Sequence, residues 1–134
     1  MADGRLISLS MACPGLTASS LLRLARGQER FYWENRRDGY ALAGFGITAE
    51  LIAWGDRFDS IRRQAEKLFA GAVIMNDGQV LAGPRLFGGF AFQDDFVPDN
   101  TWTVYAPAYF ALPHYQLVQV GAQAWLTINV DIPY

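Results

Sequence analysis

The stretch Arg85-Leu-Phe-Gly-Gly-Phe-Ala-Phe-Gln-Asp-Asp-Phe96 places four phenylalanines around two adjacent glycines. Glycine weakens a strand, so a glycine inside one usually marks a bulge or a close approach by another backbone. Residues 86–92 are also apolar on both faces, a pattern typical of a central strand that is covered on both sides. We therefore expect a central strand at 86–92, with a neighbouring backbone close to Gly88 and Gly89.

The chain after this stretch consists of short strand-like runs separated by turn residues. Further strands are predicted at 102–105, 108–112, 115–120 and 123–130. The dipeptide Gly121-Ala122 separates the last two runs and indicates a tight turn. Residues 94–100 gather three aspartates and an asparagine, but their spacing does not fit a calcium loop, so we expect a turn there.

The strongest local signal is an amphipathic helix at about 57–70. Its apolar residues fall at helical spacing on one face, namely Phe58, Ile61, Ala65, Leu68, Phe69 and Ala72. Asp56 is placed to cap the N-terminus of this helix, and Gly71 suits a left-handed C-terminal cap. Asp59 favours the positive end of the helix dipole and is expected to pair with Arg63, four residues later.

The N-terminal part of the chain is predicted to hold a short helix and a hairpin. Residues 17–26 begin with cap-forming side chains and end at an Arg-Gly pair, which suits a short helix. The aromatic run at 29–35 and the apolar run at 40–46 flank Asp38-Gly39, a strong hairpin signal. Residues 1–16 show no clear period, and no strand is predicted there.

These elements together predict one domain, 1–134, of the α+β class. It consists mainly of antiparallel sheet, with the helix at 57–70 covering one side. One helix of four turns cannot cover both faces of a sheet of six or more strands, and the chain ends just past a strand. We therefore expect the N-terminal part of a longer protein.

The composition narrows the classes of function. Of the 134 residues 51% are hydrophobic and only 18% are charged, and the net charge of −2 provides no basic field for nucleic acid or an anionic membrane. No apolar run approaches the roughly 20 residues that span a bilayer. The single cysteine, Cys13, cannot form an internal disulfide, which fits a reducing compartment. We expect a cytoplasmic protein.

No catalytic, cofactor-binding or metal-binding residue is assigned from the sequence. Residues 44–49, Gly-Phe-Gly-Ile-Thr-Ala, match a weak dinucleotide fingerprint, but the next helix begins too late, so Gly44 and Gly46 are interpreted as close-packing glycines. His114 has no partner nucleophile in a recognisable pattern, and we expect a structural role at a strand boundary. Cys13 is interpreted as a small apolar residue rather than a reactive thiol.

A series of motifs resembles the N-terminal part of isochorismate synthases, which belong to the chorismate-utilising enzymes. The motifs are Phe31-Tyr32-Trp33-Glu34, Gly44-Phe45-Gly46 and Arg85-Leu86-Phe87-Gly88-Gly89-Phe90-Ala91-Phe92, followed by "DNTW", "ALPHYQLV" and "WLTINV". The resemblance runs from about Phe31 to the end of the chain. The run at 85–92 is its most specific part.

The resemblance implies an α/β sandwich of two large antiparallel sheets with helices outside, of which this chain is one part. In that family magnesium held by glutamates binds the substrate, a lysine acts as base and a glutamate as acid, all in a C-terminal chorismate-binding region. None of those motifs has a counterpart in residues 1–134. The chain alone is therefore expected to be inactive and to lack a cofactor, with magnesium implied for the full-length enzyme.

The resemblance leaves the pathway open between menaquinone and siderophore biosynthesis. The expected partner is the C-terminal region of the same polypeptide. One alternative is another chorismate-utilising enzyme, such as a salicylate, anthranilate or aminodeoxychorismate synthase. A second is a free-standing module whose aromatic sheet binds an apolar ligand. An uncovered sheet would also allow the chain to self-associate. Residues 19–24 lack the Leu-Leu-Glu-Ser motif of the tryptophan-regulated relatives, which argues against that kind of feedback control.

Overall fold

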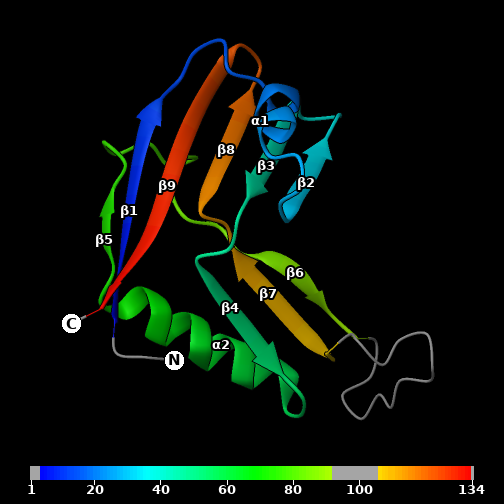
Figure 1. Ribbon diagram of the computed structural model, residues 1–134, viewed down its shortest axis with the longest axis vertical. Coiled ribbons are helices and arrows are strands. Elements are labelled where there is room, and N and C mark those ends of the chain that lie inside the picture. The colour runs from blue at the N-terminus through cyan, green and yellow to red at the C-terminus, as the bar shows by residue number, and fades with distance from the viewer. Residues whose placement is uncertain (1–3, 92–105, 134) are drawn as a thin grey trace.

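The computed structural model of the chain describes residues 4–91 and 106–133. Within these residues the fold consists of two sheets and two helices (Figure 1). In chain order the elements are β1 (Gly4–Ala12), α1 (Ala18–Leu24), β2 (Arg30–Asn35), β3 (Tyr40–Phe45), β4 (Ala49–Ala53), α2 (Arg57–Ala70), β5 (Val73–Met75), β6 (Phe87–Phe90), β7 (Ala108–Leu112), β8 (Tyr115–Val120) and β9 (Gln123–Pro133). The expected α+β class with mainly antiparallel sheet is confirmed.

The larger sheet has six strands in the order β2-β3-β8-β9-β1-β5, and the smaller sheet has three in the order β4-β7-β6. Among the described strands only β1 and β5 pair in parallel. In Figure 1 the large sheet fills the upper part of the molecule, and α2 runs below β4 of the small sheet. Over the described residues the chain crosses between the sheets four times, after β3, after β4 by way of α2, after β5 and after β7.

Both predicted hairpins of the large sheet are confirmed. Strands β2 and β3 pair antiparallel on either side of a turn that contains Asp38-Gly39, where Gly39 has a φ of +65°. Strands β8 and β9 are joined by Gly121-Ala122, and Gly121 has a φ of +59°. Gly121 is the first of two turn residues, a position at which a tight hairpin favours glycine, whereas Gly39 is the last residue of the loop 36–39.

Three strands were not predicted, and the most important of them is β1. It lies between β9 and β5 and pairs with β9 over its whole length. Its side chains do alternate, since Ile7, Leu9 and Met11 lie on one face and Ser8 and Ser10 on the other. The short strands β4 and β5 were also missed, and β9 extends three residues beyond its predicted end.

Helix α2 has the predicted bounds, but one residue of its predicted apolar face is wrong. Ile61 and Leu68 are buried as expected, whereas Phe58 is 57% exposed and Arg57 is buried in its place. The Phe58 ring instead meets Phe90 of β6, with centroids 4.7 Å apart, and the Arg57 guanidinium lies 4.2 Å from its centre. The Phe58 side chain therefore packs on the edge strand β6 of the small sheet and not in the core.

The ends of α2 differ from the prediction. Asp56 is the N-cap residue, but it has a left-handed backbone (φ +49°) and makes no side-chain capping hydrogen bond. Its carboxylate lies 3.7 Å from the Arg63 guanidinium, while Asp59 pairs with Arg62 at 3.5 Å instead of with Arg63. Gly71 ends the helix with a φ of −102°, so the expected left-handed cap is wrong.

The expected central strand at 86–92 is also wrong. Strand β6 pairs only with β7 among the described residues, and Gly88, Gly89 and Phe90 are exposed. The backbone that approaches the glycines is that of β7, because a Cβ atom on Gly88 would lie 2.6 Å from the Phe110 Cα. A Cβ on Gly89 would meet nothing within 4 Å, so the close approach is confirmed at Gly88 only. The predicted turn at 94–100 and strand at 102–105 lie outside the described residues.

Each helix forms a core with the sheet that it covers, and Leu6 of β1 in the large sheet also belongs to the core under α2. Helix α2 packs on the small sheet through a cluster that includes Leu51, Ile61 and Leu112. Helix α1 begins at Thr17, whose hydroxyl accepts from the Ser20 N–H (3.1 Å), and covers β3 and β8 of the large sheet. Neither helix in the described part of the chain has the length and hydrophobicity needed to cross a membrane.

Candidate functional site

The centre of the large sheet carries a row of buried polar side chains on one face. We call Ser8, Ser10, Gln116, Thr127 and Asn129 the polar ladder. They come from β1, β8 and β9, and each is at most 6% exposed. Strand register places Ser8 opposite Asn129, and Ser10 opposite Thr127 with their hydroxyls 2.7 Å apart. Because buried polar groups are costly unless hydrogen-bonded, such a row needs a specific cover.

Asn129 is the central member of the polar ladder. Its Nδ2 donates to Gln116 Oε1 (2.8 Å) and to the Pro113 C=O (2.9 Å), and these two acceptors fix which end of the amide faces them. Asn129 Oδ1 and the Ser8 hydroxyl, which lie opposite one another, have no hydrogen-bond partner among the described residues.

The polar ladder holds the segment 82–86 against the sheet. Gln116 Nε2 donates to the Gly83 C=O (3.1 Å), and Gln116 Oε1 accepts from the Arg85 N–H (3.2 Å). The Gly83 N–H donates to Thr127 Oγ1 at 3.3 Å. Three hydrogen bonds therefore set the path of the segment that leads into β6, and with it the position of Arg85.

A hollow of about 510 Å³ lies where this segment meets the hairpin β2–β3. We call it the aromatic hollow. Trp33, Tyr40 and Leu42 line it from the hairpin, and residues 84–88 line it from the crossing segment and β6. Trp33 and Tyr40 meet edge to face with centroids 5.5 Å apart, and the Trp33 side chain is 48% exposed. The volume is within the range typical of small-molecule sites.

The opposite face of β1, β5 and β9 is apolar and largely exposed. We call Ile7, Leu9, Met11, Val73, Met75, Leu126, Ile128 and Val130 the bare face; strand register places them on one side of the sheet. Five of them are at least 38% exposed. Helix α1 covers the neighbouring half of the same face, over Ala43 and Leu117, so the cover stops midway across the sheet (Figure 1).

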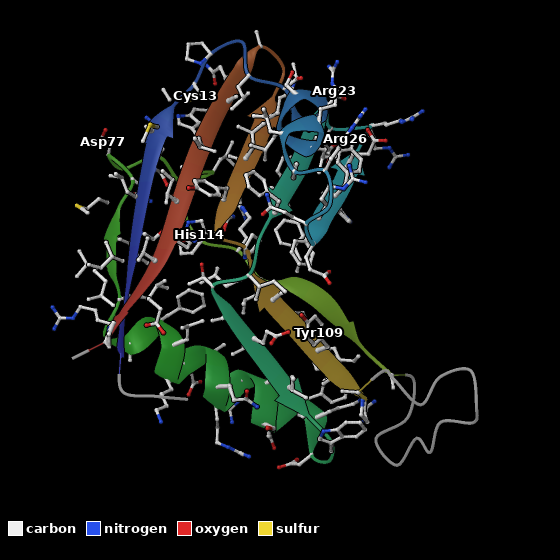
Figure 2. All side chains as sticks on the ribbon, viewed as in Figure 1. Cys13, Arg23, Arg26, Asp77, Tyr109 and His114 are labelled. Atoms are coloured by element: carbon white, nitrogen blue, oxygen red, sulfur yellow. The ribbon has the colours of Figure 1, made fainter. Side chains whose placement is uncertain are left out.

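His114 lies at the junction of the two sheets (Figure 2), and its expected place at a strand boundary is confirmed. Its Nδ1 lies 3.3 Å from Thr48 Oγ1, and that hydroxyl donates to the Asn129 C=O at 2.8 Å. The His114 backbone N–H donates to the Gly46 C=O (3.2 Å), and its C=O accepts from the Asn129 N–H (2.9 Å). These contacts tie together the crossing after β3 and the crossing after β7.

The glycines at 44–46 have packing roles, as predicted. A Cβ on Gly44 would lie 2.9 Å from the Pro113 ring, and Gly46 has a φ of +71° beside His114. The chain then enters β4 rather than a helix, which rules out the dinucleotide fingerprint.

Two of the described tyrosines, Tyr32 and Tyr109, have a raised pKa. Tyr109 lies on β7 (Figure 2), and its hydroxyl donates to Glu50 Oε2 on the neighbouring strand β4 at 2.7 Å. Partial burial raises the pKa of Tyr109 to about 12, and the hydrogen bond to the Glu50 carboxylate adds to this effect. The shift keeps the phenol protonated, which is the wrong direction for a general base.

The described residues gather no group of three or more His, Cys, Asp or Glu side chains that could hold a metal ion. They therefore do not fit a magnesium site, and we derive no chemical step through one. Cys13 is a free, half-buried thiol at the end of β1 (Figure 2).

No site residue was predicted from the sequence, and neither the polar ladder nor the aromatic hollow was expected. The alternation of Ser8 and Ser10 with apolar residues in β1 was a signal for the ladder, but alternation alone does not tell which face is buried. The hollow combines residues 33–42 with residues 84–88, and no local pattern connects these two segments.

Comparison with known proteins gives one clear match. The family model described as "Chorismate binding enzyme" matches residues 2–133, nearly the whole chain. No curated protein matches the chain.

Proposed function

This chain belongs to the chorismate-binding enzyme family, and from that premise we propose that it is the N-terminal structural segment of an isochorismate synthase. The full enzyme would interconvert chorismate and isochorismate for menaquinone or siderophore synthesis, and would use magnesium held by residues outside this chain. The segment itself would supply strands and packing surface and would be inactive alone. We place it in the cytoplasm, because its single cysteine fits a reducing compartment.

The observation that carries this proposal is the bare face. Eight apolar side chains lie side by side on β1, β5 and β9, and among them only Leu126 packs against the α1 cluster. Contiguous exposed apolar patches of this kind usually mark an interaction site. We propose that the C-terminal region of the same polypeptide covers this face. In the isolated chain the same face would favour self-association, which sedimentation at rising concentration would detect.

The test is the formation of isochorismate from chorismate with magnesium. It compares the 134-residue chain, a version extended to the stop codon of the gene, and the extension alone. We expect turnover only by the extended version, because the extension lacks the strands of this segment. Turnover by the 134-residue chain alone, or by the extension alone at the full rate, would contradict the proposal.

The same assay and the gene sequence also distinguish two other functional assignments. Another chorismate-utilising activity would appear as salicylate or an aminated product in place of isochorismate. A free-standing binding module is favoured by the aromatic hollow, and it predicts a natural stop codon directly after Tyr134. A reading frame that continues into a chorismate-binding region supports the enzyme.

A further inference from the structure

The walls of the aromatic hollow are apolar and held in place. Phe87 on one wall is stacked on Phe31 of β2, with ring centroids 5.5 Å apart and planes at 27°. On the other wall Tyr40 meets Trp33 edge to face, at 75° between the rings. In an edge-to-face pair at least one ring face is left for another partner, and about half of the Trp33 side chain is exposed. The hollow therefore presents a surface on which a flat ring can stack.

Arg85 is the one cationic residue among the described residues that line the hollow, and none of these is acidic. Its backbone is fixed by the bond to Gln116, and its Nη2 donates to the Leu81 C=O at 2.7 Å. A guanidinium has five N–H groups. Several donors thus remain for a ligand, on a side chain whose position is already set by two hydrogen bonds.

We propose that the aromatic hollow binds a small carboxylate that carries a flat ring. The ring stacks on Trp33 between the walls, and the carboxylate accepts hydrogen bonds from Arg85. Guanidinium–carboxylate pairs form charge-assisted, often bidentate bonds, which select this group over a neutral one. Because no described lining residue is acidic, the described lining has no carboxylate to pair with an ammonium group beside Arg85, and a simple acid is preferred over the matching amino acid.

This site stands on residues of the chain itself and does not depend on the isochorismate synthase proposal. Either can fail alone, because one is read from turnover by the extended chain and the other from binding to the 134-residue chain.

The test uses benzoate as the probe and NMR spectra of the ¹⁵N-labelled chain. The side-chain N–H signal of Trp33 is identified by its absence in Trp33→Phe. We expect benzoate to shift the Trp33 signal and to leave the Trp54 signal unchanged, because Trp54 is exposed outside the hollow. Benzamide, the same ring without the charge, should bind about tenfold more weakly or worse. Phenylpropionate should likewise bind more tightly than phenylalanine.

Three arginine variants test whether Arg85 causes the preference for benzoate over benzamide. Arg85→Gln should remove the preference for benzoate over benzamide, while Arg36→Gln, at a cation outside the hollow, should leave it unchanged. Arg85→Lys keeps the charge and should retain part of the preference, which gives a second reading if Arg85→Gln lowers the melting temperature. Equal shifts at Trp33 and Trp54, no shift at Trp33, or an unchanged preference in the Arg85 variants would overturn the proposal.

Discussion

The two faces of strands β1 and β9 reverse the usual chemistry of a sheet. The face with the polar ladder is buried under the segment 82–86, although its side chains are Ser, Thr, Asn and Gln. The other face, with Leu9, Met11 and Val130, is apolar and left uncovered. In a free-standing sheet the apolar face would be buried and the polar face exposed to water.

The two faces differ in whether the described residues of this chain supply their packing partners. On the polar face the hydrogen-bond partners are nearly all present, and they specify one path for the crossing segment. On the bare face Leu126 packs against the α1 cluster, whereas Leu9, Met11, Val73, Met75 and Val130 remain exposed. The same contrast recurs at two adjacent residues of β6, since β7 explains why Gly88 is a glycine and no described neighbour explains Gly89.

The largest effect is expected at Asn129. Asn129→Ala should lower the free energy of unfolding by about 3 kcal/mol, because Gln116 Oε1 and the Pro113 C=O each lose a buried donor. Val130→Ala, the next residue and on the bare face, should cost less than about 1 kcal/mol. Urea unfolding of both variants measures the difference, and equal losses would remove the contrast between the faces.

The two glycines provide the next test. Gly88→Ala should destabilise the chain by about 2 kcal/mol, because the new methyl group would press on the backbone of β7. Gly89→Ala should be neutral or slightly stabilising in the 134-residue chain, because space is open and alanine restricts the unfolded chain more. Urea unfolding of the paired variants decides this, and a similar loss at both positions would show that the position of β7 is wrong.

Leu9 tests the bare face in two contexts. Leu9→Gln should cost less than about 1 kcal/mol in the 134-residue chain, where the side chain is 41% exposed. In the extended chain the same change should cost about 2 kcal/mol or more, because the leucine would be buried there. Denaturant unfolding of the four proteins gives the comparison. The same small cost in both contexts would mean that the extension does not cover this face.

The smallest effect is a pH dependence at Tyr109, within the small sheet. Its pKa is about 12 in the folded chain against 10.0 for an unperturbed tyrosine. The folded state then holds the proton more tightly, so stability is complete below about pH 10 and falls as the pH rises towards about 12. Tyr109→Phe should remove this part of the fall. Urea unfolding at about pH 9 and pH 11 would show it, and parallel profiles for both proteins would contradict it.

Local signals sufficed for part of the fold. The bounds of α2 followed from apolar periodicity, and both hairpins of the large sheet followed from their turn residues. The caps of α2 did not follow, because backbone geometry at Asp56 and Gly71 decides them rather than residue type. Phe58 was wrongly predicted to be buried, because the helical spacing allows either Arg57 or Phe58 to face the core. The Phe58 ring packs on Phe90 of β6 instead.

The candidate site was beyond local reasoning. Strand β1 was missed because its buried face is the polar one, and Ser8 and Ser10 are buried only because the distant residues of the polar ladder and segment 82–86 meet them. The aromatic hollow was missed for the same reason, since Gln116 positions Arg85 from 31 residues away. Long-range hydrogen bonds, and not the motifs, place these groups.

The most direct test of the account is the oxidation of Met11 and Met75, which both lie on the bare face and are 40% and 47% exposed. Peroxide treatment followed by mass spectrometry gives the rate of sulfoxide formation at each methionine. We predict that both react readily in the 134-residue chain and at least about tenfold more slowly in the extended chain, where the extension would exclude the oxidant. Equal rates in the two proteins would contradict the central claim that this chain is a structural segment covered by the rest of its polypeptide.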